Sequence, residues 1–278
     1  MATSAEITVT SFMVEDLMTE YSEKQRYFTK VVLTFIYIQI IVNWLCTVCN
    51  GSELKPTLDR PDLEKSLWVH NNEGSTGTRV GGRVDRTGLH WKWCSKCRIE
   101  QPPRCHHCKI CDKCILKRDH HCIFTATCIG FYNQRNFTVL VFYTTLSISI
   151  YLPMLWNYFY WYSNQHWVSY ILPIAIFKFL TGGLSFKWMI LVSQLYTMWW
   201  MGFMAFSFLC SQILVISKGV TSYELHKKIP IRCTAGVKQN FRDVFGDFWA
   251  LNLIFPTQLV FGQKGNGKNW EYLKIEEK

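Results

Sequence analysis

Eight of the twelve cysteines in this chain lie between Cys94 and Cys128, which marks the segment as a centre of sulfur chemistry. Cys94 and Cys97 form a C-x2-C pair, and cysteines then recur at three-residue steps from Cys105 to Cys114. Four histidines are interleaved with them, namely His106, His107, His120 and His121. Thiolates two residues apart chelate Zn2+, which takes four tetrahedral sulfur or nitrogen ligands. The segment therefore offers ligands for two zinc ions, with four groups left over.

The sequence "DHHC", from Asp119 to Cys122, indicates a second kind of chemistry. A free cysteine beside histidines can be an activated nucleophile, because an imidazole takes its proton or stabilises the thiolate. Spacing alone does not say which four groups are spare. The alternative to metal is a set of unliganded buried thiols. So short a segment, with Pro102-Pro103 and few aliphatic side chains, needs metal to fold.

The composition and the apolar runs of the rest of the chain predict the helices that position the cysteine-rich segment. Of its 278 residues 49% are hydrophobic and only 18% are charged. No charge occurs between Lys30 and Glu53, and the apolar run 31–48 approaches the roughly 20 residues that cross a bilayer. We expect further spans at 137–162 and 188–216. The fold class that follows is an α-helical multi-pass membrane protein with an irregular, two-zinc, cysteine-rich cytosolic domain.

This reading divides the chain into six parts. They are a polar N-terminal segment 1–30, a transmembrane helix 31–49, a polar linker 50–90, the cysteine-rich zinc domain 91–136, a transmembrane region 137–216 and a cytosolic C-terminal segment 217–278. Inside the transmembrane region, the stretch 167–184 contains Pro173, Lys178 and a Gly-Gly pair. It is therefore ambiguous between a short span, a re-entrant piece and an interfacial helix.

The charge distribution predicts which side of the membrane each part faces. The net charge is +10, and basic residues outnumber acidic ones in both 90–136 and 217–247, next to the spans. The positive-inside rule assigns such blocks to the cytosol, where cysteines bind metal rather than form disulfides. We identify no basic low-complexity tail and no internal repeat. We therefore expect membrane lipid, and not nucleic acid, as the partner of the positive charge.

At this point the residues resemble a known family. Cys94 to Phe137 resembles the cysteine-rich domain of the DHHC-type protein S-acyltransferases, the palmitoyltransferases. The resemblance rests on Cys94/Cys97, "PPR" (102–104), "HCKICDKC" (107–114), "DHHC" (119–122), "CIG" (128–130), and Asn133 with Phe137. Two weaker signatures, "TSYE" (221–224) and "QNFRDVFG" (239–246), look like the family's C-terminal elements.

The resemblance implies a division of labour among these groups. It implies two interleaved structural zinc sites, one made by Cys94, Cys97, His107 and Cys114, the other by Cys108, Cys111, His121 and Cys128. It leaves Cys122 as the nucleophile and His120 as its base. Asp119 would fix the tautomer of His120, as the third member of a triad does. A turn-capping carboxylate is the alternative for Asp119.

The reaction that the resemblance implies is transfer of a long acyl chain, such as palmitoyl. It would pass from acyl-CoA to Cys122 and then, in a ping-pong sequence, to cytosolic cysteines of substrate proteins. Arg104 matches a position that reaches the CoA phosphates, although Gln101 replaces its usual lysine neighbour. Ser222 would contact Asp119, and Glu224 and Asn240 would brace the C-terminal segment against the catalytic domain. Endoplasmic reticulum or Golgi membranes are the expected location, and the oligomeric state is left open.

Two departures from the family pattern keep an alternative function open. Ile123 and Phe124 replace the Pro-Trp pair that usually follows "DHHC", as in a short animal subgroup. The alternative is a catalytically weak or inactive membrane zinc module that scaffolds a partner. A membrane RING-like ubiquitin ligase is a third reading, but it gives the Asp-His-His-Cys group no role.

The second departure concerns topology. One convincing span precedes Cys94, where the family has two, so a cytosolic zinc domain places the N-terminus in the lumen. Otherwise the run 31–48 does not fully cross, or the amino-terminal sequence differs from that of relatives. The sequon Asn50-Gly51-Ser52 would be lumenal only if the chain crossed again before Cys94. For "TSYE" to reach the zinc domain, two crossings must intervene, so we expect 167–184 not to cross.

Overall fold

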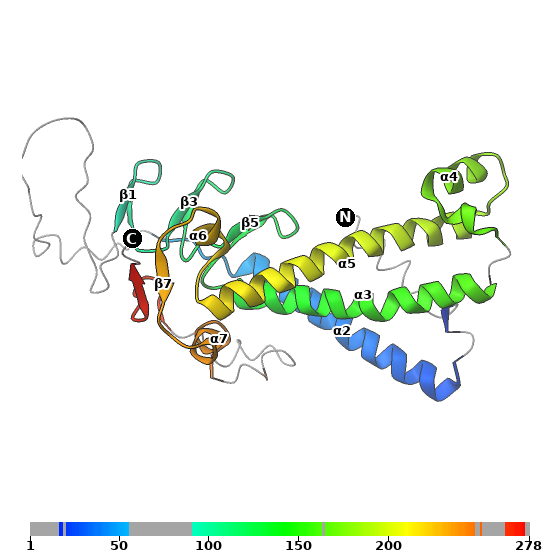
Figure 1. Ribbon diagram of the computed structural model, residues 1–278, viewed down its shortest axis with the longest axis horizontal. Helices are drawn as coiled ribbons and strands as arrows, with labels where there is room; N and C mark the ends of the chain where they lie inside the picture. The colour runs from blue at the N-terminus through cyan, green and yellow to red at the C-terminus, as the bar shows by residue number, and fades with distance from the viewer. Residues whose placement is uncertain are drawn as a thin grey trace, which may run out of the picture. The chain divides into compact units, whose positions relative to one another are not determined.

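The computed structural model describes residues 17–18, 21–55, 91–162, 165–247, 251 and 265–275 (Figure 1). The helices in these residues are α2 (Glu23–Cys49), α3 (Gln134–Tyr162), α4 (Leu172–Leu180), α5 (Phe186–Lys218), α6 (Ser222–His226) and α7 (Val237–Phe245), with a 3-10 turn η1 (Trp167–Tyr170). The strands are β1 (Lys92–Cys94), β2 (Ile99–Gln101), β3 (His106–Cys108), β4 (Lys113–Ile115), β5 (His120–Cys122), β6 (Thr127–Ile129), β7 (Ile231–Cys233) and β8 (Leu273–Ile275).

The chain forms two compact units. Unit 1 comprises Met1–Ile41 and Leu140–Cys210, and unit 2 comprises Val42–Val139 and Ser211–Lys278. Most of the expected linker, residues 56–90, lies outside the described residues, as does most of the expected N-terminal segment.

Three helices, α2, α3 and α5, are long and apolar enough to cross a membrane. Each extends beyond its expected apolar run: α2 begins at Glu23 rather than at 31, α3 at Gln134 rather than at 137, and α5 covers 186–218. The reason is that straight-chain polar residues such as Glu23 propagate a helix well, so hydrophobicity marks the buried part and not the helix end. The chain is a helical membrane protein.

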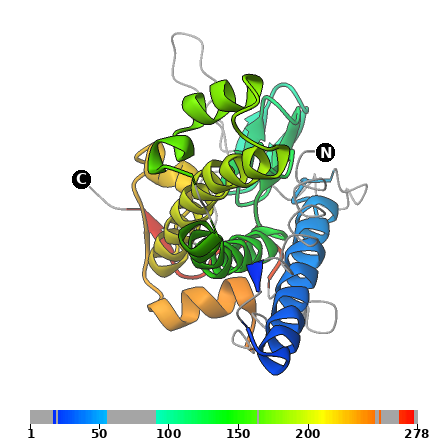
Figure 2. The same ribbon diagram turned by 90° about the vertical axis from the view of Figure 1, so that its right-hand side faces the viewer.

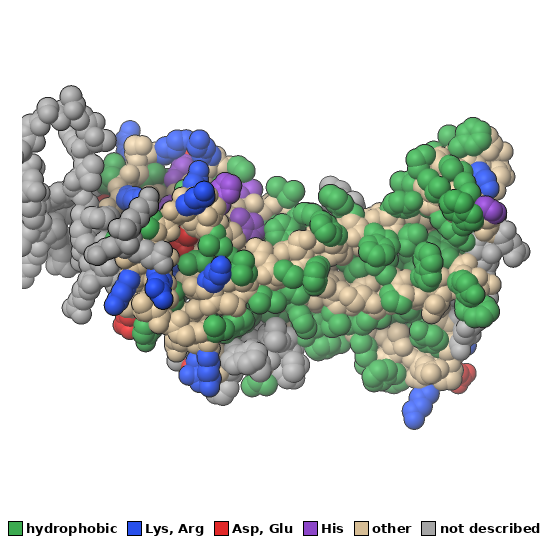
Figure 3. Space-filling model, in the orientation of Figure 1, with side chains coloured by type: hydrophobic (Ala, Val, Ile, Leu, Met, Phe, Trp, Pro, Cys, Tyr) green, Lys and Arg blue, Asp and Glu red, His purple; other side chains and the backbone are tan. Residues whose placement is uncertain are grey.

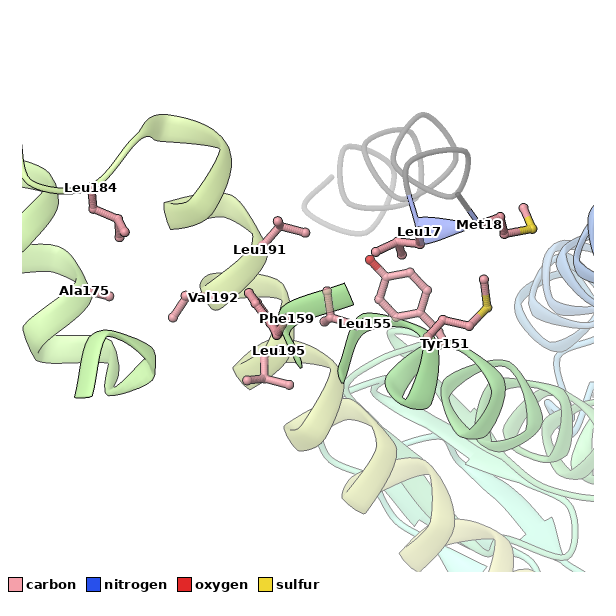
Figure 4. Close-up of a cluster of buried hydrophobic side chains, with 11 residues drawn as sticks. Leu17, Met18, Tyr151, Leu155, Phe159, Ala175, Leu184, Leu191, Val192 and Leu195 are labelled. Carbon is pink, nitrogen blue, oxygen red and sulfur yellow. The ribbon is translucent and has the colours of Figure 1, made fainter. Parts of the chain in front are cut away.

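Unit 1 is held together by a buried cluster of apolar side chains (Figure 4). It includes Leu155 and Phe159 of α3 and Leu191 and Val192 of α5. The Tyr151 hydroxyl donates a 2.9 Å hydrogen bond to the Gln194 side-chain oxygen. Figures 1 and 2 show α3 and α5 as neighbouring helices, and Figure 3 shows many hydrophobic side chains on the long helices.

Helix α4 and the turn η1 fill the ambiguous stretch 167–184. Helix α4 has nine residues, starts with Pro173 in its first turn and is followed by Gly182 at φ 76°. At 1.5 Å per residue it is about 14 Å long, roughly half of the hydrocarbon thickness. It is too short to span a bilayer, so between the cysteine-rich segment and α6 only α3 and α5, among the described residues, are long and apolar enough to cross.

Unit 2 contains three successive β-hairpins, β1–β2, β3–β4 and β5–β6, each antiparallel (Figure 1). They begin at Lys92, His106 and His120, which are evenly spaced along the chain, and we call this pattern the hairpin repeat. A left-handed residue closes each turn at the same spacing, with φ of 52°, 51° and 49° at Arg98, Asp112 and Ala126. The expectation that the chain has no internal repeat was therefore wrong: the repeat is short and its residues differ, so only the backbone makes it plain.

Strands of three residues are too short to be stable alone, so the hairpins need other supports. One support is the segment after α2, where the Leu54 N–H donates to the Cys114 carbonyl and the Leu116 N–H donates to the Ser52 carbonyl, both at 2.8 Å. Ser52 belongs to the sequon and is 1% exposed. The sequon thus lies against hairpin β3–β4.

Asn133, between β6 and α3, is the hub of the second support. It is fully buried, its side-chain oxygen accepts from the Gly130 N–H at 2.8 Å, and its amide group donates to the carbonyls of Thr47 and Cys128 at 3.0 Å each. Gly130 is required because a Cβ there would lie 2.6 Å from the Leu116 carbonyl oxygen. One amide therefore links the end of α2, hairpin β5–β6 and the start of α3.

We predict that Asn133→Ala destabilises the protein, because it leaves one buried N–H and two buried carbonyls without a partner, at about 1–3 kcal/mol for each group. The measurement is the melting temperature in detergent, followed by size-exclusion chromatography. Asn136→Ala is the control, since Asn136 is equally buried but its amide makes no hydrogen bond within the described part of the chain. Equal losses in the two variants would contradict the role given to Asn133.

Candidate metal centres and active site

Two groups of four side chains bring sulfur and imidazole ligands together in unit 2. We define cluster 1 as Cys94, Cys97, His107 and Cys114, and cluster 2 as Cys108, Cys111, His121 and Cys128. Within each cluster the ligand atoms all lie within 4.8 Å of one another. These are the two sets that the family resemblance implies, and the structure brings every member of each set together.

The geometry of both clusters suits a tetrahedral ion. In cluster 1 the His107 Nδ1 lies 3.7 Å from the Cys94 sulfur and 3.2 Å from the Cys97 sulfur. In cluster 2 the His121 Nδ1 lies 3.2 Å from the Cys111 sulfur. With Zn–S bonds of about 2.3 Å and Zn–N bonds of about 2.0 Å, the edges of a tetrahedron are about 3.5–3.8 Å. Three thiolates and one imidazole are also a common donor set for structural zinc.

The clusters follow the hairpin repeat and are shared between hairpins. In both clusters the ligands come in the order Cys, Cys, His, Cys, at the same separations along the chain. The first two ligands lie on the turn of one hairpin, and the other two form a cross-strand pair of the next, such as His107 with Cys114. Consequently hairpin β3–β4 contributes to both clusters.

Hairpin β5–β6 carries the remaining reactive group. The His120 Nδ1 lies 2.8 Å from a carboxylate oxygen of Asp119, and His120 lies near enough to Cys122 to lower the pKa of its thiol. Phe137 of α3 packs edge-on against the imidazole at 5.2 Å between ring centres. Cys122 and Asp119 are both 2% exposed. The order carboxylate, imidazole, thiol is the arrangement that activates a sulfur nucleophile.

Asp119 is held by two further groups from other parts of unit 2, and a third supports one of them. The Ser222 backbone N–H donates to one carboxylate oxygen at 2.5 Å, and the Gln212 side-chain amide donates to the other at 2.8 Å. Gln134 in turn donates to the Gln212 oxygen at 3.1 Å. The expected contact of Ser222 with Asp119 therefore exists, but its donor is the backbone N–H at the start of α6, not the hydroxyl.

These contacts control the charges of the triad. Burial by itself would raise the pKa of Asp119, but hydrogen bonds from His120, Ser222 and Gln212 outweigh it and hold the pKa below its ordinary value. Burial likewise opposes the charged imidazole, yet Asp119 and Cys122 raise the pKa of His120 to about 9. Burial disfavours the Cys122 thiolate, but His120 and the turn after Cys122 bring its pKa below that of a free thiol. Both shifts favour the imidazolium–thiolate form of the pair over the neutral form.

Comparison with known proteins identifies the family. A family model described as DHHC palmitoyltransferase matches residues 89–229, which is about half of the chain and includes both clusters and the triad. The chain belongs to the DHHC palmitoyltransferase family.

Individual relatives agree with this assignment. Palmitoyltransferase ZDHHC22 of Danio rerio is 36% identical over 166 residues, which cover 58% of this chain and 60% of that protein. Probable protein S-acyltransferase 12 of Arabidopsis thaliana is 31% identical over 233 residues, covering 80% of this chain and 72% of that protein. The chain thus spans about 60% of the length of the ZDHHC22 relative and more of the plant one.

The contacts of Arg104 in this DHHC family member differ from those that were expected. Its guanidinium is 2% exposed and makes a bidentate ion pair with Glu224 at 2.7 and 2.8 Å. It also donates to the Gly219 carbonyl at 3.2 Å and lies 4.6 Å above the Trp270 ring. Contact with CoA phosphates stays a prediction, while the observed contacts make Arg104 the link between the cysteine-rich segment and α6.

Glu224 and Asn240 act at opposite sides of the C-terminal segment. Burial would raise the pKa of Glu224, but the charge of Arg104 and its hydrogen bonds lower it. Glu224 also closes a capping box with Thr221 at the start of α6. Asn240 differs from expectation: its amide donates to the Ser217 carbonyl at the end of α5 and accepts from the Cys233 thiol, so it braces α7 against α5 rather than against the hairpins.

A cavity of about 490 Å³ lies between these elements, lined by Arg104, Lys117 and Trp270 among others. Burial lowers the pKa of Lys117 to about 8.

Sequence reasoning missed three polar residues of this centre, namely Gln134, Gln212 and Thr125. Both glutamines are 1% exposed, and for Gln212 the signal that could have found it is an amide within the expected span 188–216. Gln134 lies just before the expected span 137–162, at the first position of α3, and has no such signal. Thr125 is 3% exposed, its hydroxyl has no hydrogen-bond partner among the described residues, and its proximity helps to lower the pKa of Cys122. Its signal is the spacing, since Thr125 follows Cys122 at the same interval as Cys97 follows Cys94.

We predict that Gln212→Leu lowers the reactivity of Cys122 and the melting temperature, because it removes a hydrogen bond to a buried carboxylate worth about 1.5–3 kcal/mol. Gln212→Glu should lower both further, since it places a second carboxylate against Asp119. Alkylation of Cys122, followed by mass spectrometry of its peptide, measures the reactivity. Gln134→Leu is the matched control, one hydrogen bond further from Asp119, and should have the smaller effect. Wild-type alkylation in Gln212→Glu would contradict the prediction.

Proposed function

We propose that this protein is a protein S-acyltransferase that moves a long acyl chain, such as palmitoyl, from acyl-CoA to cysteines of substrate proteins. The observation that carries the proposal is the triad at hairpin β5–β6, where the His120 Nδ1 lies 2.8 Å from the Asp119 carboxylate and His120 lowers the pKa of the Cys122 thiol. Membership of the DHHC palmitoyltransferase family and the names of the relatives support it.

In this proposal, two zinc ions bound by clusters 1 and 2 have a structural role. When bound, each ion supplies the cross-link that holds two neighbouring hairpins together. The donor set of three sulfurs and one nitrogen, and its near-tetrahedral spacing, support zinc at both places. His121 and His120 then do different work although they are adjacent, because neighbouring side chains of a strand point to opposite faces.

The first half of the proposed reaction loads the enzyme. The Cys122 sulfur attacks the carbonyl carbon of the acyl-CoA thioester, a new carbon–sulfur bond forms, and the bond to the CoA sulfur breaks. His120 gives its proton to the departing CoA thiolate. The hydrogen bonds that hold Asp119 keep the imidazole in the orientation that this proton transfer needs.

The second half returns the enzyme to its starting state. The thiol of a substrate protein gives its proton to His120 and attacks the acyl group on Cys122, and Cys122 leaves as a thiolate. One thioester replaces another in each half, so little free energy changes and the enzyme contributes mainly activation and positioning. The two halves make a ping-pong sequence with an acyl-enzyme intermediate.

The membrane supplies the place for the acyl chain. The spanning helices would flank the tail of the donor, whose transfer from water contributes about 0.8 kcal/mol for each buried CH2. The basic residues around the hairpins, which Figure 3 shows gathered with histidines on that part of the molecule, support a cytosolic orientation by the positive-inside rule. The membrane partner is thus lipid, the protein partners carry cytosolic cysteines, and the endoplasmic reticulum or Golgi is the proposed compartment.

We predict that the purified protein incubated with alkyne-tagged palmitoyl-CoA is labelled on Cys122, and that hydroxylamine removes the label because it is a thioester. Cys122→Ser should abolish this label, whereas Cys49→Ser, which changes an exposed cysteine of the same unit, should keep it. In-gel fluorescence and mass spectrometry of the peptides measure the outcome. An unlabelled wild-type protein with full zinc content would favour the scaffold alternative.

We predict two zinc ions per chain by elemental analysis. Cys108→Ser removes a ligand of cluster 2 and should lower the zinc content and the melting temperature. Cys105→Ser is the matched control, since Cys105 is a buried cysteine outside both clusters, and it should retain both ions. Zinc loss in Cys105→Ser alone would refute the proposed ligand sets.

A further inference from the structure

The turns of the three hairpins become steadily more apolar along the chain. We define turn 1 as Ser95–Lys96, turn 2 as Lys109–Ile110 and turn 3 as Ile123–Phe124, and all six of these residues are exposed. Each pair follows directly after the first strand of its hairpin, so the three pairs occupy the same place in the hairpin repeat. At that place the residues change from Ser-Lys through Lys-Ile to Ile-Phe.

Turns 2 and 3 expose large apolar side chains. Ile110 is 73% exposed, Ile123 is 77% exposed and Phe124 is 44% exposed. A single apolar side chain on a protein surface is ordinary, but here three of them gather in two neighbouring turns. Exposed lysines accompany them, one in turn 1 and one in turn 2. An apolar tip beside lysines is the composition of a surface that lies in a membrane interface.

Hairpin β5–β6 contacts all three helices that are long and apolar enough to cross a membrane. The Asn133 amide joins the Thr47 carbonyl of α2 to the carbonyl of a β6 residue, at 3.0 Å each. Phe137 of α3 packs against the triad imidazole at 5.2 Å between ring centres, and Gln212 of α5 donates to the triad carboxylate at 2.8 Å. The helix residues in these contacts belong to the apolar runs 31–48, 137–162 and 188–216. Hairpin β5–β6 therefore lies at the boundary of the membrane.

The other two hairpins lie successively further from this boundary. Hairpin β3–β4 hydrogen-bonds Ser52 and Leu54, which follow the end of α2 at Cys49. Hairpin β1–β2 is joined to β3–β4 through cluster 1, and Figure 1 shows the three hairpins as a row in chain order. A three-residue strand is about 10 Å long, so turn 3 lies within about 10 Å of the contacts with the spanning helices. The apolar turn is thus the one nearest the bilayer, and the polar turn is the one furthest from it.

We propose that turns 2 and 3 form a docking surface for the phospholipid leaflet at this end of the spanning helices. Ile123 and Phe124 enter the layer between the headgroups and the acyl chains, where amphipathic and aromatic side chains gather. Lys109 binds the phosphate and carboxylate groups of anionic lipids beside Ile110. Turn 1 stays in water. Docking would hold Cys122, which directly precedes turn 3, at a fixed depth in the membrane interface.

The test uses the unsubstituted full-length protein in lipid nanodiscs of phosphatidylcholine, with and without phosphatidylserine. A photoreactive diazirine is carried either by the headgroup or by the upper acyl chain of the phospholipid, and mass spectrometry maps the lipid adducts after irradiation. We expect the acyl-chain probe to label turn 3, the headgroup probe to label turn 2, and neither probe to label turn 1 above background. Because no acyl transfer is measured, the result is independent of the proposed function.

Two matched variants test the charge of turn 2. A lysine near an anionic surface contributes about 1 kcal/mol, which is a factor of about five in binding. We therefore expect Lys109→Ser to lower headgroup labelling of turn 2 about fivefold with phosphatidylserine present, and to change it little without. Lys96→Ser, which removes the lysine of turn 1, should leave that labelling unchanged. Zinc content is measured for both, and Lys109→Gln replaces Lys109→Ser if the ions are lost.

The labelling of the unsubstituted protein decides the proposal whatever the variants do. Absence of adducts on turn 3 in a sample where α3 is labelled would overturn it and would make turn 3 a surface for a protein partner. Equal labelling of turns 1 and 3 would overturn it as well. Equal losses in Lys109→Ser and Lys96→Ser would refute the contact assigned to Lys109.

Discussion

The sharing of each ligand cluster between two neighbouring hairpins is the constraint on which the rest of unit 2 depends. Hairpins with three-residue strands have too little surface to stabilise themselves, and clusters 1 and 2 each bring together side chains of two neighbouring hairpins. Because His107 and Cys114 serve the turn before them, while Cys108 and Cys111 serve the pair after them, the middle hairpin fixes both neighbours. The two clusters therefore fix the positions of all three hairpins relative to one another.

Each cluster joins the turn of one hairpin to the strands of the next, so the turn of the last hairpin, β5–β6, has no following hairpin to join. This last turn begins at Cys122, the proposed nucleophile. Its surroundings come from segments far apart in sequence: Gln212 from α5 and the N–H of Ser222 from the start of α6 both bind Asp119. Arg104 and Glu224 then join α6 to the cysteine-rich segment. The triad is thus supported on one side by a ligand cluster and on the other by a hydrogen-bond network that the helix ends supply.

The sequence predicted the parts of this site whose signal is local. Spacing indicated two zinc sites, and the family resemblance supplied the members of both clusters and the group of Asp119, His120 and Cys122, because such groups must be particular residue types at particular separations. Apolar runs gave the three long helices but not their ends. Two kinds of contact in the site could not be predicted from the sequence. The contact of Gln212 with Asp119 joins residues 93 positions apart, and no spacing rule encodes it.

The second kind of contact is one in which the residue is expected but the atom that makes the contact is not. Ser222 contacts Asp119 through its backbone because a capping box at Thr221 orients the first turn of α6, and the residue type alone suggested the hydroxyl. Arg104 looked available to a ligand, since a sequence does not show that Glu224 lies against it, 2% exposed. The hairpin repeat was hidden because Trp93 and Glu100 stand in the first hairpin where His107 and Cys114 stand in the second.

Loss of an ion from cluster 2 would affect Cys122 more directly than loss of an ion from cluster 1. His121 directly precedes Cys122 in the chain, and Cys128 closes the same hairpin, so an ion lost from cluster 2 would release the strand that bears the nucleophile. An ion lost from cluster 1 would loosen the far end of the array, while Asn133 and Asp119 still anchor the last hairpin. Oxidants or chelators that remove the ion of cluster 2 would then lower the proposed activity more than those that remove the ion of cluster 1. The activity would depend mainly on whether cluster 2 holds its ion.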